Sequence, residues 1–104
     1  MAEPRYAANI GLIAGLVLGC TGAFPAQDLA ARSWAASCAS CHGTDGRSAG
    51  VVPSLAGRSK SDLLAVLKEF KAGKRTSTIM HQYALGYSDA ELERIADYFS
   101  QQPR

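Results

Sequence analysis

The sequence is poor in the residues that bind metals, with three cysteines, two histidines and two methionines among 104 residues. It contains no second CxxC pair, no glycine-rich phosphate-binding motif and no paired catalytic carboxylates. Phosphoryl transfer and hydrolysis therefore have no visible basis in the sequence, and a zinc site built on two CxxC pairs is excluded. A net charge of +2 also gives no indication of nucleic-acid binding or of strong attraction to an anionic surface.

Charge is missing altogether between residues 6 and 26, where apolar and small side chains dominate. With Arg5 before this stretch and small residues at its end, residues 1–26 are predicted to form a secretory signal peptide and to direct the chain to the periplasm. Two alternatives stay open. In the first alternative, the stretch is an uncleaved membrane anchor. In the second, VLGC (residues 17–20) is a lipobox, and Cys20 is lipidated. Either alternative would attach the protein to a membrane.

The predicted mature domain, residues 27–104, has roughly 80 residues, a size at which an apolar core alone supplies little stability. A further stabilising element is expected in a domain of this size. The pentapeptide CASCH, from Cys38 to His42, offers one, because in a helical turn Cys38, Cys41 and His42 stand at i, i+3 and i+4 on one face.

Four interpretations of CASCH compete. A disulfide leaves His42 unexplained, and a thioredoxin-like pair needs a βαβ pattern that is missing. A zinc site needs a fourth ligand, for which His81 is the candidate. C-x-x-C-H is the attachment signal of c-type haem, in which both thiols bond to the vinyl groups and the histidine reaches the iron. Export and the small core favour this fourth interpretation.

A second iron ligand is expected from Met80 or its neighbour His81, in a polar segment read as a loop between two helices. Met80 is preferred, because a thioether raises the reduction potential into a range useful for electron transfer. Neighbours in an extended loop point in opposite directions, so one of the two binds the iron. His81 is then expected to face solvent or to form a hydrogen bond.

Three helices are predicted and no strands, which indicates an all-α fold. The first runs from about Asp28 into CASCH and the second from about 61 to 72, capped by Ser59 or Ser61. Ser88 and Glu91 form a capping box for the third, whose buried face is predicted to be Leu92, Ile95, Ala96 and Phe99. A basic group precedes Met80 and is interpreted first as a solvated helix face, with a surface for an acidic redox partner as the functional alternative. It consists of Lys68, Lys71, Lys74 and Arg75.

CASCH, GVVPSLAG (residues 50–57) and STIMHQYALGYSDAELERIADYFSQQ (residues 77–102) together resemble, in order and spacing, the class I bacterial cytochromes c. The resemblance covers about residues 36–101 and is strongest to the haem domains of the cytochrome subunit of flavocytochrome c sulfide dehydrogenase. It implies a fold of about three main helices wrapped around one covalent haem c. The first and last helices would cross near Trp34 and Phe99.

The resemblance assigns thioether bonds to Cys38 and Cys41, and proximal and distal ligation to His42 and Met80. It places Pro53 and Leu55 against the cofactor, with the Pro53 carbonyl accepting a hydrogen bond from the His42 ring. The implied protein is a non-enzymatic electron carrier whose partner is a redox protein, such as a sulfide-oxidising flavoprotein. A gas-binding or peroxidatic haem protein with a displaceable sixth ligand is the alternative. This chain departs from many such subunits in having one CxxCH instead of two haem domains.

Overall fold

The computed structural model describes residues 26–104, together with Gly15, Gly19 and Gly22. Apart from these three glycines and Ala26, the predicted signal peptide lies outside the described residues, and so does Cys20. The described part of the chain forms five α-helices and no strands, so the predicted all-α class is confirmed. None of the described helices has the length and apolar character needed to cross a membrane.

The first predicted helix is divided in two. Helix α1 spans Leu29–Ala36 and helix α2 spans Ala39–His42. The division follows from Ser37, whose hydroxyl donates to the Trp34 carbonyl oxygen at 2.8 Å and so competes with the helical backbone. The prediction of one continuous helix into CASCH was therefore wrong, although both parts are helical.

Helices α3 (Lys60–Lys71) and α5 (Asp89–Ser100) are the longest, and both begin at the predicted kind of cap. Ser59 Oγ accepts from the Asp62 N–H at 3.4 Å, and Ser88 Oγ accepts from the Glu91 N–H at 3.2 Å. Such caps satisfy backbone N–H groups that the first helical turn leaves unpaired.

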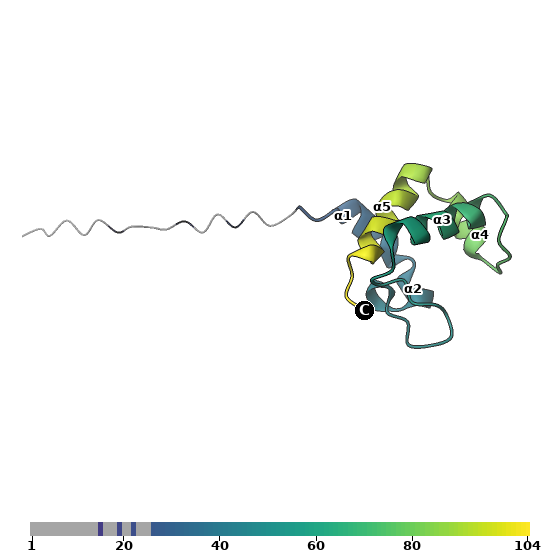
Figure 1. Ribbon diagram of the computed structural model, residues 1–104, viewed down its shortest axis with the longest axis horizontal. Coiled ribbons are helices and arrows are strands. Elements are labelled where there is room, and N and C mark those ends of the chain that lie inside the picture. The colour runs from purple at the N-terminus through teal and green to yellow at the C-terminus, as the bar shows by residue number, and fades with distance from the viewer. Residues whose placement is uncertain (1–14, 16–18, 20–21, 23–25) are drawn as a thin grey trace, which may run out of the picture.

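Helix α5 packs against both α1 and α3, while α4 (Met80–Leu85) packs against α3 (Figure 1). The predicted buried face of α5 is confirmed, since each of its four side chains is 3% exposed or less. Trp34 of α1 packs on the same cluster as Phe99, as the predicted helix crossing requires. The core cluster consists of Ala35, Leu63, Ile95, Ala96 and Phe99.

The glycine-rich segment after His42 is a loop, as predicted, apart from one 3₁₀ turn, η1 (Thr44–Gly46). Gly46 has φ +79°, and a Cβ atom there would lie 2.8 Å from Cδ1 of Phe99. Its carbonyl oxygen accepts from the N–H groups of Leu55 and Ala56, at 2.7 and 3.2 Å. Glycine at this position thus allows the PSLAG segment to lie against the last helix.

Candidate functional site

The side chains of CASCH converge as predicted. Cys38 lies at the start of α2, and Cys41 and His42 form its last turn. All three line one cavity. Partial burial raises the pKa of the Cys38 thiol.

The ring of His42 is held by the loop that follows it. Its Nδ1 lies 2.6 Å from the carbonyl oxygen of Pro53. Because a carbonyl oxygen only accepts, Nδ1 donates, and in the neutral imidazole Nε2 then has the free lone pair. The expected hydrogen bond between His42 and Pro53 is therefore present, and it leaves His42 in the form that ligates a metal.

Met80 and His81 lie in different surroundings. Met80 lines the same cavity as the CASCH side chains, whereas His81 is not among the residues that line it. The Nδ1 atom of His81 lies 2.7 Å from the carbonyl oxygen of Phe70, in a partly buried position. The expectation that His81 forms a hydrogen bond is met. The predicted extended loop was wrong, however, because both residues lie in the first turn of α4.

The cavity has a volume of about 400 Å³ and a largely apolar wall. It brings together all six predicted site residues: Cys38, Cys41, His42, Pro53, Leu55 and Met80. The predicted apolar face of α3 supplies part of the wall, which explains why Leu67 and Phe70 are only partly buried although Leu63 is buried. Further wall residues are Val52, Ile79, Tyr83, Leu92, Ile95 and Phe99.

The chain matches a known family over most of its length. The family described as "Cytochrome C oxidase, cbb3-type, subunit III" matches residues 25–99. The chain belongs to the class I cytochromes c. Membership implies one covalently bound haem c, and the residues present fit it: paired thiols, an imidazole with a free Nε2 and a thioether around an apolar cavity.

Three relatives show how far the similarity extends. The cytochrome is 51% identical over 63 residues to the "Cytochrome subunit of sulfide dehydrogenase" of Chlorobaculum tepidum, covering 61% of this chain and 57% of that protein. It is 44% identical over 90 residues to a "Cytochrome c4" of Pseudomonas aeruginosa, covering 84% and 45%. It is 37% identical over 70 residues to "Cytochrome c-554(548)" of Halomonas halodenitrificans, covering 64% and 84%. The chain thus spans about half the length of the first two relatives.

Two cations line the cavity of the cytochrome, which sequence reasoning did not place there. Arg58 precedes α3, and Arg75 follows it. Both the Nε and Nη2 atoms of Arg75 lie 2.8 Å from Oε2 of Glu69, and its guanidinium lies 5.7 Å from the centre of the Phe70 ring. For Arg58, its position directly after the PSLAG segment could have indicated that it lies near the cavity.

The predicted basic group is only partly available to a partner. Lys71 donates to the Tyr87 carbonyl oxygen at 2.7 Å and to Asp89 at 3.1 Å, and Arg75 is paired with Glu69. Within residues 26–104, no ion pair involves Lys68 or Lys74. These two lysines remain the parts of the group with charge directed to solvent.

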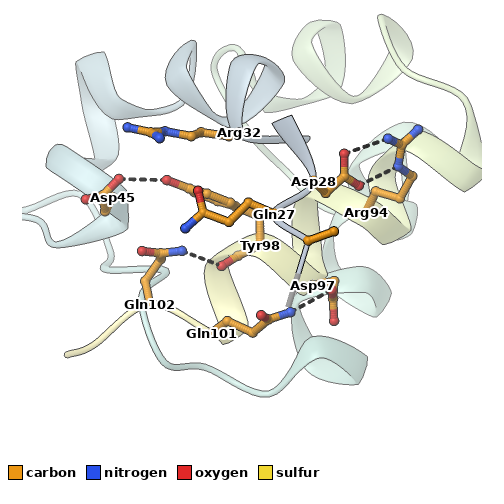
Figure 2. Close-up of a pocket in the computed structure, with 10 residues that line it drawn as sticks. Gln27, Asp28, Arg32, Asp45, Arg94, Asp97, Tyr98, Gln101 and Gln102 are labelled. Atoms are coloured by element: carbon orange, nitrogen blue, oxygen red, sulfur yellow. Dashed lines mark hydrogen bonds and ion pairs between the residues drawn. The ribbon is translucent and has the colours of Figure 1, made fainter. Parts of the chain in front are cut away.

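A second cavity, of about 770 Å³, is larger and more polar than the first, and several of its side chains bond to one another (Figure 2). Arg94 donates to both carboxylate oxygens of Asp28, at 2.6 and 2.7 Å. The Tyr98 hydroxyl donates to Asp45 at 2.7 Å. These bonds join the N-cap of α1 and the η1 turn to α5, so the residues of this polar cavity stabilise the fold. The apolar cavity remains the candidate functional site.

Proposed function

We propose that this cytochrome carries single electrons between redox proteins. Its haem would be bonded to Cys38 and Cys41 through thioethers and held between His42 and Met80. The observation that carries this proposal is the convergence of these four side chains on one apolar cavity. When bound, the haem supplies reversible one-electron chemistry at its iron.

The residues of the chain favour electron transfer over binding of a gas or peroxide. His42, fixed by Pro53, offers Nε2 from one side, and Met80 offers a thioether from another element of the same wall. With both axial positions occupied by side chains, a small exogenous molecule must displace one of them. The thioether also favours the reduced iron and thereby raises the reduction potential.

Arg58 and Arg75 supply the charge that an otherwise apolar site needs. Haem carries carboxylates at its edge, and carboxylates in an apolar setting require a partner. A guanidinium matches a carboxylate in shape and charge. We assign these two arginines to the haem carboxylates, with Glu69 holding Arg75 at the wall of the cavity.

The proposed partner is a flavoprotein sulfide dehydrogenase, for which this cytochrome would serve as the cytochrome subunit or as a soluble acceptor. The support is the 51% identity to a cytochrome subunit of sulfide dehydrogenase. We further propose that the leader exports the chain to the periplasm, where thiols can be joined to haem, with lipidation at Cys20 or an uncleaved leader as the route to membrane attachment.

Absorption spectroscopy tests the carrier function. The reduced protein is expected to show a low-spin haem spectrum that added carbon monoxide does not change. Immediate binding of carbon monoxide by the wild-type protein would contradict it and favour a gas-binding protein. For the partner, we expect a flavoprotein to co-purify with the native cytochrome, or to reduce it when sulfide is added. If neither result is obtained, the sulfide dehydrogenase is not the partner, and the electron-carrier function still stands.

A further inference from the structure

We propose that His81 is a positioning residue that holds the first turn of α4 so that Met80 faces the haem cavity. The inference rests on the proposed function, because it takes Met80 as the distal ligand. Met80 and His81 are consecutive and both partly buried, yet Met80 lines the cavity and His81 does not. Something must fix which of the two side chains faces inward.

The first fixing contact is made by the imidazole. Its Nδ1 donates to the Phe70 carbonyl oxygen at 2.7 Å. Phe70 lies in the last turn of α3, where carbonyl oxygens lack the N–H partners that the helix interior provides. This oxygen also accepts from the N–H of Gly73 at 3.1 Å. The imidazole thus ties α4 to the end of α3 at a site that favours a hydrogen-bond donor.

The second contact is made by the backbone of the same residue. The side chain of Ile79 cannot cap α4, but the N–H of His81 donates to Ser77 Oγ at 3.1 Å. Helix α4 has six residues, too few to be stable by itself. Its orientation therefore depends on bonds to residues outside the helix, and His81 makes two of them, one local bond to Ser77 and one tertiary bond to Phe70 of α3.

The hydrogen bond from His81 to Phe70 also keeps the His81 imidazole from binding the iron in place of Met80. An imidazole is a common ligand of iron and lies one residue from the thioether. With Nδ1 bound to Phe70, the ring is held against α3 and away from the cavity wall. We infer that His81 determines both the presentation of Met80 and its own exclusion from the iron.

The test uses the haem-loaded full-length protein with substitutions H81A, H81N and, as control, Q82A. Gln82 is the next residue of α4 and is exposed. The probe is carbon monoxide added to the reduced protein, which binds only when the Met80 thioether leaves the iron. We expect H81A to bind carbon monoxide at least tenfold faster than the wild type. H81N, whose amide N–H can reach the same carbonyl, should recover most of the difference, and Q82A should match the wild type.

A further variant, S77A, keeps the imidazole and removes the acceptor for the His81 N–H. It should accelerate carbon monoxide binding by a smaller factor than H81A. Far-UV circular dichroism must show unchanged helix content in each variant.

Two results would overturn the proposal, and they are distinguishable. If H81A and S77A bind carbon monoxide as slowly as the wild type while the wild type shows methionine ligation, the positioning role fails and the proposed function stands. If H81A loses the low-spin spectrum and M80A keeps it, His81 is the distal ligand, and both the positioning role and the assignment of Met80 to the iron fail.

Discussion

The imidazole of His42 donates from Nδ1 to the carbonyl oxygen of Pro53 over 2.6 Å. This bond joins helix α2 to the loop that carries Leu55. His42 and Pro53 both line the apolar cavity, together with Cys38 and Cys41. It fixes the tautomer and the orientation of the ring before any metal is bound. One side of the site is therefore pre-organised by the loop, whereas the Met80 side depends on α4.

Replacement of Met80 with alanine should open the iron on that side. We expect M80A to bind carbon monoxide in the reduced state and to have a lower reduction potential, because the thioether stabilises the reduced iron. Spectroelectrochemical titration and carbon monoxide addition measure the two effects. Q82A is the control; an unchanged potential in M80A would show that the sulfur does not bind the iron.

The charge of Arg75 should affect the reduction potential of the haem more than the charge of its neighbour Lys74. Oxidised haem carries one more positive charge than reduced haem, so a cation at the cavity wall disfavours the oxidised state. We expect R75Q to lower the ratio of reduced to oxidised protein about threefold to tenfold at fixed applied potential, where tenfold corresponds to about 59 mV for one electron.

The matched control is K74Q, which removes the same charge from an exposed side chain outside the cavity wall. The Arg75 side chain is itself 46% exposed, so solvent and salt screen both charges. The smaller effect expected for K74Q follows from its position outside the cavity wall. Equal shifts for R75Q and K74Q would mean that Arg75 acts only through the net charge of the protein.

Gly46 should not tolerate a side chain. Its φ of +79° and the 2.8 Å approach of a Cβ atom to Phe99 Cδ1 predict that G46A lowers the free energy of unfolding by about 2 to 4 kcal/mol. At Gly50 no atom lies within 4 Å of the same added carbon, so G50A should change it by less than about 0.5 kcal/mol. Urea unfolding measures both variants, and equal effects would contradict the packing of this loop on α5.

The Asp28 and Arg94 pair should make stability depend on acid pH. The hydrogen bond from Arg94, followed by that from the Ala31 N–H, lowers the pKa of Asp28 from 3.8 to about 2. A lowered folded-state pKa means that the pair stabilises the fold above about pH 4 and that this contribution is lost as the pH falls through about 2.

Urea midpoints between pH 2 and pH 7 should therefore decline less steeply in D28N and R94Q than in the wild type. The double variant should lose less stability than the sum of the two single losses, because both single variants remove the ion pair, while R94Q also removes the cation–π contact of Arg94 with Trp34. Independent, additive losses would show that the two residues are not coupled.

The helices were predictable where a local signal determines them. Ser88 accepts from the Glu91 N–H as its spacing indicated, and the apolar period of α5 gives its buried face correctly. Helix α4 was missed because it has six residues and is held by contacts with α3, which no local pattern reveals. At the break between α1 and α2, the hydroxyl of Ser37 bonds to the carbonyl oxygen of Trp34 and so competes with the backbone N–H groups that would continue the helix.

For the site, the candidates came from CxxCH and from the adjacent pair Met80 and His81. The fold brings Met80, but not His81, to the cavity that CxxCH lines. The sequence did not reveal that Arg75 lines this cavity, because its position follows from the bond to Glu69 six residues earlier and from the path of the chain after α3. Long-range pairs such as Asp28 with Arg94, 66 residues apart, likewise have no local signal.

The ligation of iron by His42 and Met80 is tested most directly by proton NMR of the reduced protein. A methionine methyl group that lies over a haem ring is shifted far upfield by the ring current. The wild type should show this signal, M80A should lose it, and H81A should keep it. A wild-type spectrum without the signal, or one in which M80A retains it, would contradict the proposed site.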